Sequence, residues 1–179
     1  PPMLNAGERM FAYRFEGYWK DVGTISSLWQ ANMEVLDPTH SGINLFDENW
    51  KIYSRNSGMT GHKIGSDAVI KNSMITDGCR IDGEVEHSVL FAGVKVAPGA
   101  VVKDAVVMGG TVIKPGAVVE HCIIGENAVI GENAKIGVEK EGEDKGVATI
   151  GPGVYVGDGA TVGSNAMVRE NVKDGEEEW

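Results

Sequence analysis

The dominant pattern in the sequence is one apolar residue that returns at nearly regular intervals from Ile64 onward. Its steps mostly cycle through six, six and five residues, so that three steps add up to 17. Each step then corresponds to a short strand that rises about 3.3 Å per residue before a corner. We therefore predict a single-stranded parallel β-helix of hexapeptide repeats with three sides per turn. The recurring positions are Ile64, Ile70, Ile75, Ile81, Val85, Leu90, Val96, Val102, Val107, Ile113, Val119, Ile124, Ile130 and Ile136.

The residues between these positions fit the same architecture. Small or β-branched side chains stand four places after many of the apolar residues, where a triangular coil has little room, and Gly, Asn or Asp fills the corners. The small or β-branched positions are Ala68, Cys79, Ala100, Thr111, Ala117, Ala128 and Ala134. The period fails from Gly137 to Thr149, which we interpret as a loop extruded from one coil, and it resumes at Ile150. Counting the sides predicts roughly six coils.

The sequence before the repeats has a different organisation. Ile25, Leu28, Trp29, Asn32, Met33 and Leu36 share one helical face, with Thr24 or Ser26 as N-cap and Asp37-Pro38 as the stop. Alternating aromatic residues at 11, 13 and 15 predict a strand. Residues 39–62 are interpreted as a linker with one short strand around Trp50, Ile52 and Tyr53. Because the predicted first strand has no preceding partner, we expect the chain to be the C-terminal part of a longer protein.

Composition and charge exclude several classes of function. The 25 glycines agree with many tight turns, and the formal net charge of -10 argues against a nucleic-acid or anionic-membrane partner. The sequence contains neither a run of about 18 apolar residues nor a basic-then-apolar leader, so we expect a cytoplasmic protein. Cys79 and Cys122 lie inside repeat units among apolar neighbours, and we interpret them as buried thiols.

The densest group of candidate functional residues is residues 17–24, GYWKDVGT, directly before the predicted helix. The N-terminus of a helix offers unpaired N–H groups and a positive dipole end to a phosphate, and Asp21 could supply a carboxylate oxygen to a magnesium ion there. Alternatively, Asp21 and Thr24 cap the helix and Trp19 packs in the core. The spacing alone favours this structural interpretation.

A resemblance to a known family favours the ligand-binding interpretation of residues 17–24 over the structural one. Residues 18–24 (YWKDVGT), residues 29–33 (WQANM) and the repeat segment at 86–91 (EHSVLF) closely resemble the C-terminal part of bacterial glucose-1-phosphate adenylyltransferases, also called ADP-glucose pyrophosphorylases. The resemblance implies synthesis of ADP-glucose and pyrophosphate from ATP and glucose 1-phosphate with Mg²⁺, in glycogen biosynthesis. It also implies that Asp21 is a magnesium ligand and that Trp19 lines the sugar-nucleotide site.

The same resemblance implies a domain organisation. Residues 1–38 are a C-terminal remnant of the α/β nucleotidyltransferase catalytic domain, 39–62 the linker, 63–172 a left-handed β-helix and 173–179 an acidic tail, whose Trp179 we expect to cap the last coil or contact a neighbour. The family's glycine-rich phosphate loop, its substrate-binding lysine and its other metal carboxylate belong to an N-terminal domain that this sequence does not include. We therefore expect the chain to be inactive alone and to serve assembly, as a homotetramer or a heterotetramer with a paralogue.

Two other functions remain open. His87 and His121 share one repeat position, 34 residues apart, and hexapeptide acyltransferases use a β-helix histidine as general base. A solvent-facing corner position, filled elsewhere by Asn72 and Asp104, explains the histidines more simply. A non-catalytic regulatory subunit is the other alternative. Family members that respond to anionic effectors use basic residues, some of them in the β-helix. Here Glu120 and His121 occupy the repeat segment where some members place a basic residue, which argues against strong activation by an anion.

Overall fold

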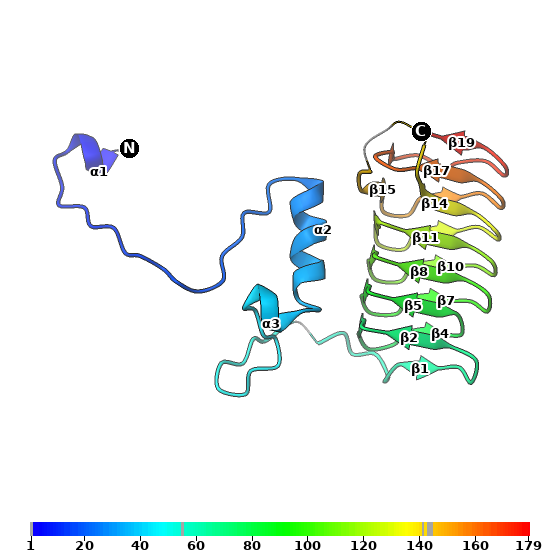
Figure 1. Cartoon of the computed structure of the whole chain (residues 1–179), viewed down its shortest axis with the longest axis horizontal. Coiled ribbons are helices and arrows are strands. Elements are labelled where there is room, and N and C mark those ends of the chain that lie inside the picture. Colours follow the sequence, from blue (N-terminus) through cyan, green and yellow to red (C-terminus); the bar gives the residue numbers. More distant parts are fainter. Residues whose placement is uncertain (1, 55, 141, 143–144) are drawn as a thin grey trace.

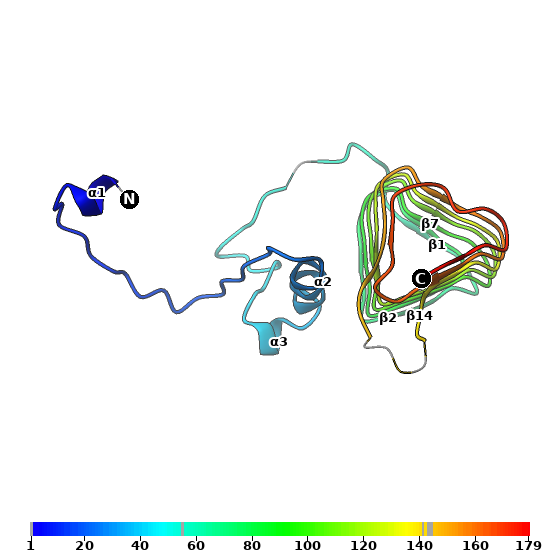
Figure 2. The same ribbon diagram turned by 90° about the horizontal axis from the view of Figure 1, so that it is seen from above.

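The computed structural model describes residues 2–54, 56–140, 142 and 145–179, and its main body is a parallel β-helix. Three short helices precede it: α1 (Pro2–Asn5), α2 (Ile25–Glu34) and α3 (Pro38–Ser41). Figure 1 shows the turns of the β-helix stacked on one another and α2 lying beside them. Figure 2, seen along the stack, shows a three-sided coil whose turns lie almost directly over one another.

Each side of the coil is one parallel sheet. Sheet A has six strands, β1 (Lys63–Ile64), β4 (Arg80–Ile81), β7 (Lys95–Val96), β10 (Val112–Ile113), β13 (Val129–Ile130) and β16 (Tyr155–Val156). Sheet B has seven, β2 (Val69–Lys71), β5 (Glu84–Glu86), β8 (Val101–Lys103), β11 (Val118–Glu120), β14 (Lys135–Val138), β17 (Thr161–Gly163) and β19 (Glu177–Glu178). Sheet C has six, β3 (Met74–Ile75), β6 (Val89–Leu90), β9 (Val106–Val107), β12 (Cys122–Ile124), β15 (Ala148–Ile150) and β18 (Met167–Val168).

The β-helix has about seven turns, one more than the roughly six that we predicted. The difference lies at the C-terminal end. Val172 bridges to Val156 of sheet A, and β19 pairs with β17 of sheet B, so residues 172–178 form part of another turn. The apolar period does not predict this strand, because Glu177 and Glu178 stand where an apolar residue would continue the period. Trp179 follows them and lies over Gly163 of the preceding turn.

Most of the repeating apolar residues form the interior of the coil, as predicted, whereas Ile64 and Ile70 on the first turn are exposed. Most of the largest fully buried side chains belong to that series, including Ile81, Leu90, Ile113, Ile124, Ile130 and Ile136. Cys79 and Cys122 are buried free thiols, and burial raises the pKa of both. One corner carries a non-glycine residue with φ between 37° and 48° in four successive turns, at Asn72, His87, Asp104 and His121. This confirms that the corners need unusual dihedrals.

The interruption of the period is a loop between β14 and β15. It is shorter than the predicted 137–149, because Gly137 and Val138 still belong to β14 while Ala148 and Thr149 belong to β15. Residues 141, 143 and 144 of this predicted loop lie outside the described residues. Gly137 has φ +83°, and a Cβ at this position would overlap the carbonyl oxygen of Glu120, so the chain can leave the coil here only with glycine.

Two predictions for the N-terminal part are wrong. The aromatic residues at 11, 13 and 15 lie in no strand, and their side chains are exposed, because no neighbouring strand is there to pair with them. The described residues of the linker, 39–54 and 56–62, contain no strand either, and Trp50, Ile52 and Tyr53 are exposed. None of the described helices is long and apolar enough to cross a membrane.

Helix α2 forms as predicted and packs on the outer face of sheet C. Thr24 is its N-cap, in a reciprocal capping box with Ser27. Its buried Met33 joins a cluster with Val89, Val106 and Ile123, the outward-facing residues of β6, β9 and β12. The helix is thereby fixed on the solenoid by a second, smaller apolar core, and it carries the segment that precedes it.

Candidate functional site

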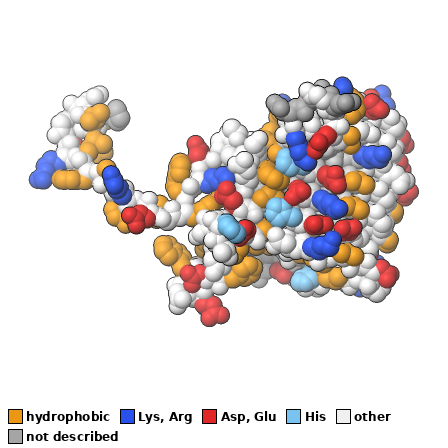
Figure 3. Space-filling model, in the orientation of Figure 1, with side chains coloured by type: hydrophobic (Ala, Val, Ile, Leu, Met, Phe, Trp, Pro, Cys, Tyr) orange, Lys and Arg blue, Asp and Glu red, His pale blue; other side chains and the backbone are white. Residues whose placement is uncertain are grey.

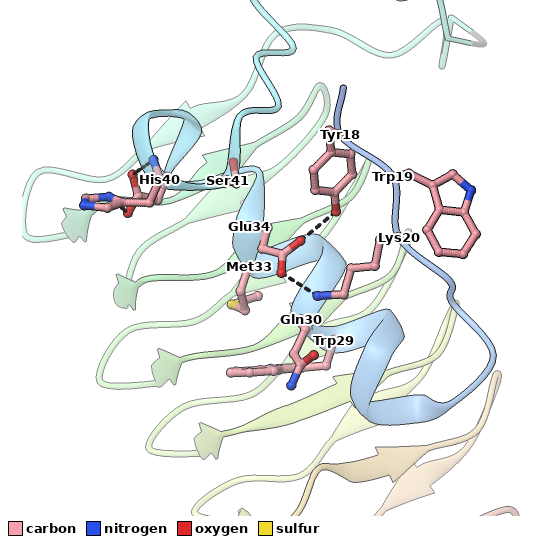
Figure 4. Close-up of a pocket in the computed structure, with 10 residues that line it drawn as sticks. Tyr18, Trp19, Lys20, Trp29, Gln30, Met33, Glu34, His40 and Ser41 are labelled. Carbon is pink, nitrogen blue, oxygen red and sulfur yellow. Dashed lines mark hydrogen bonds and ion pairs between the residues drawn. The ribbon is translucent and has the colours of Figure 1, made fainter. Parts of the chain in front are cut away.

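The segment before α2 is anchored to the helix by one carboxylate. The Tyr18 hydroxyl donates a hydrogen bond to Glu34 Oε2 over 2.7 Å, and the Lys20 ammonium forms an ion pair with Glu34 Oε1. Figure 4 shows Tyr18 and Lys20 pointing toward Glu34 and Trp19 pointing away from it. Side chains of an extended chain alternate in this way. The anchor therefore turns Trp19 outward from α2.

The anchor has a defined charge state. Hydrogen bonds from Lys20 and Tyr18 hold the pKa of Glu34 below its usual value. Burial, together with the hydrogen bond and the charge of Glu34, raises the pKa of Tyr18 to about 12. At neutral pH Glu34 is therefore a carboxylate between a charged lysine and a neutral phenol, and the ion pair is locally neutral.

Trp19 and Asp21, the predicted site residues, are both exposed. Trp19 has 76% of its surface accessible, so the alternative that it packs in the core is wrong. Asp21 is exposed too, and the cap of α2 is Thr24, so Asp21 is not needed to begin the helix. The structure thus leaves both side chains available for a ligand, and their predicted roles stay predictions.

The described residues do not assemble a magnesium site by themselves. No three His, Cys, Asp or Glu side chains among them gather into a group that could hold a metal ion. Asp21 alone offers one carboxylate, and magnesium ordinarily takes one or two carboxylates and completes its shell with water and phosphate. Asp21 can therefore contribute one ligand to such a site but cannot define it.

A hollow of about 660 Å³ lies between this segment, α2 and α3. Tyr18, Trp19, Lys20, Trp29, Met33 and Glu34 contribute to its lining. Glu34 is not among the site residues predicted from the sequence. The signal that could have indicated it is the alternation of residues 18–21 before a helix that ends with a single acidic residue, but a contact between residues 16 apart lies outside any repeat.

Trp29 attaches α2 to the corner of the β-helix. Its Nε1–H donates to the Asp104 carbonyl oxygen over 2.7 Å, and its ring lies 4.4 Å from the His121 ring, centroid to centroid, at 59°. The predicted solvent-facing position of His121 is therefore wrong, since the ring is partly covered by α2. Burial lowers the pKa of His121, and the nearby Lys145 adds to this effect.

The two corner histidines, His87 and His121, make different contacts. His87 Nδ1 lies 2.6 Å from Asp104 Oδ1, whereas His121 stacks on Trp29. Neither ring lines the hollow beside Tyr18. The histidines therefore occupy equivalent corners without forming a shared site, which favours the structural explanation over a general base.

Comparison with known proteins gives two family matches. Residues 58–157 match the family model described as GlmU-like, C-terminal hexapeptide, and residues 1–38 match the model described as Nucleotidyl transferase.

Individual relatives agree with both matches. The chain is 55% identical over 108 residues to a glucose-1-phosphate adenylyltransferase of Clostridium perfringens (strain SM101 / Type A), which covers 60% of this chain and 28% of the relative. It is 51% identical over 108 residues to the enzyme of that name from Bacillus mycoides, covering 60% and 28%, and 50% identical over 103 residues to that of Geobacillus stearothermophilus, covering 58% and 26%. The chain thus spans little more than a quarter of the length of these curated relatives.

Proposed function

The chain belongs to the GlmU-like, C-terminal hexapeptide family, and we propose that it is the C-terminal part of a glucose-1-phosphate adenylyltransferase. The proposed reaction joins ATP and glucose 1-phosphate to ADP-glucose and releases pyrophosphate, as a step of glycogen biosynthesis. The nucleotidyl transferase match over residues 1–38 and the names of the relatives support it. The observation that carries it is the exposed pair Trp19 and Asp21, held in place by the anchor on Glu34.

In this proposal the chain supplies one edge of the active site. A phosphate oxygen of glucose 1-phosphate attacks the α-phosphorus of ATP, the bond to the bridging oxygen breaks, and pyrophosphate leaves. Trp19 offers an aromatic face to the sugar nucleotide. Asp21 would donate one oxygen to Mg²⁺, whose charge would stabilise the negative charge on the reacting phosphates. The remaining binding groups would come from the part of the relatives' length that this chain does not cover.

The β-helix would serve assembly and the support of this edge. Solenoids expose flat sides and ends that association buries, and we propose a tetramer of complete chains, of one kind or with a paralogue. A cytoplasmic location fits a metabolic enzyme of this class. The anchor on Glu34 and the Trp29 contact connect the β-helix to residues 18–21, so changes in the solenoid can reach the site through α2.

A fusion tests the reaction. The chain is joined to the N-terminal part of the C. perfringens relative, and ADP-glucose and pyrophosphate are measured after addition of ATP, glucose 1-phosphate and Mg²⁺. Equal amounts of both products support the proposal. A folded fusion that produces neither contradicts it and favours the regulatory-subunit alternative. Transfer of an acetyl group from acetyl-coenzyme A, abolished by His87→Ala, would favour the acyltransferase instead.

A further inference from the structure

The outer face of sheet B carries a regular alternation of charge. Lys71, Glu86, Lys103 and Glu120 stand in register on β2, β5, β8 and β11, one on each of four successive turns. They form a column of positive, negative, positive and negative charge, with neighbours about 4.8 Å apart. Figure 3 shows Lys or Arg and Asp or Glu side chains alternating up the front of the solenoid. We call these four residues the charge column.

The ion pairs within the chain leave the side chains of the charge column partly exposed and only weakly paired. Lys71 and Lys103 lie 3.4–4.0 Å from the carboxylates of Glu86 and of Glu84 in the neighbouring column, and the side chains of these two lysines and two glutamates remain 33–58% exposed. Exposed pairs of this kind contribute only about 0–1 kcal/mol each. The charges therefore remain available to a partner that lies on this face.

The order of signs suits a second copy of the chain. When two such columns meet face to face about a twofold axis parallel to the strands, the order of turns reverses while the position along each strand is kept. Lys71 of each copy then faces Glu120 of the other, and Glu86 of each faces Lys103 of the other. All four contacts are attractive. In the neighbouring column, Val69, Glu84, Val101 and Val118 stand in register, and the same axis brings Val69 to Val118 and Glu84 to Val101.

The other two sides lack this property. Sheet C is covered by α2 over several turns. Sheet A presents Lys63, Arg80 and Lys95 in register on three successive turns, so a reversed copy centred on these turns would place like charges opposite one another. In Figure 2 the turns are nearly superimposed, so the strands of sheet B form one continuous side of the coil.

We propose that the sheet B face, centred on the charge column, is a twofold interface between two copies of this chain. This inference does not rest on the proposed reaction. It shares with the proposed assembly only the expectation that copies associate, and association through another face would refute this inference while leaving the assembly intact.

The test is sedimentation equilibrium of the 179-residue chain and its charge variants. We expect a dimer that weakens as NaCl rises from about 50 to about 500 mM, because salt screens exposed charges. Glu86→Lys and Lys103→Glu each turn two contacts repulsive and should raise the dimer Kd on the order of tenfold or more. An equimolar mixture of the two variants should recover an affinity close to that of the original chain, since each positive charge then faces a negative one. Lys95→Glu, on sheet A, is the matched control and should leave the Kd unchanged.

A second pair keeps the test decisive if either variant misfolds, as judged by circular dichroism. Lys71→Glu and Glu120→Lys change the outer contacts by the same logic and should also dissociate alone and associate when mixed. A chain that stays monomeric at about 1 mM, where even weak specific contacts are populated, overturns the proposal. So does a dimer that is indifferent to all four substitutions, or mixtures of folded variants that associate no better than each variant alone.

Discussion

Replacing Trp29 tests how α2, and with it the candidate site, is held on the β-helix. Trp29→Phe keeps an aromatic ring beside His121 but removes the hydrogen bond to the Asp104 carbonyl. A hydrogen bond contributes a net of about 0.5–1.5 kcal/mol, so the population in which α2 is undocked should rise roughly fivefold. Trp29→Ala also removes the ring contact and apolar burial, and the loss should reach about 3 kcal/mol, or on the order of a hundredfold.

Hydrogen exchange of the α2 amides measures this directly. Protection of the amides of residues 29–34 should fall by these factors, while the amides of β10 and β13 in the interior of the stack should keep theirs. Ser26→Ala, at an exposed position on the same helix, is the control and should change little. Unchanged α2 protection in Trp29→Ala would refute the claim that Trp29 holds the helix. Equal loss of protection in α2 and in sheet A would show that the two unfold as one unit.

Three further predictions concern the core, the anchor and the thiols. Ile113→Ala, in the fully buried column, should lower the free energy of unfolding by about 2–5 kcal/mol in urea titration, whereas the exposed Lys95→Ala should change it by less than about 0.5 kcal/mol. Because the pKa of Glu34 is lowered, its contacts with Tyr18 and Lys20 stabilise residues 18–20 at pH above the ordinary carboxyl pKa of 4.5, and this contribution is lost as the pH falls through the lowered pKa. Proteolysis near Tyr18 should therefore become faster in acid. The Glu34→Gln variant should be cleaved rapidly already at neutral pH. Cys122 is buried with a raised pKa, so a thiol reagent should label it only after unfolding, and rapid labelling of the native chain would contradict its burial.

The fold was largely predictable because a solenoid repeats one local rule. Ile113, Val119 and Ile124 each occupy the interior of a side, and their steps of six and five residues are visible without any long-range information. The last turn escaped prediction because its sheet B side is formed by the backbone pairing of Glu177 and Glu178, without the apolar residue that marks the other turns. The aromatic residues at 11, 13 and 15 show the opposite error, since alternation makes a strand only where a partner strand exists.

The candidate site was predictable only in part. Motif resemblance indicated Trp19 and Asp21, and the structure leaves both exposed. The anchor that orients them depends on Glu34, and the support of α2 depends on the Asp104 carbonyl, 75 residues from Trp29. Such contacts follow from the packing of a non-repeating helix on the solenoid. No periodicity in the sequence specifies them.

The Asp21→Asn substitution in the fusion enzyme tests whether residues 18–21 form one edge of a nucleotidyltransferase active site. The initial rate of ADP-glucose formation should fall on the order of 100-fold or more at fixed Mg²⁺, because a group that stabilises charge on the reacting phosphates is lost. Asp67→Asn, an exposed aspartate on the first turn of the β-helix, should leave the rate unchanged. Equal rates for Asp21→Asn and the parent fusion would contradict the metal role of Asp21 and remove the basis for placing the site here.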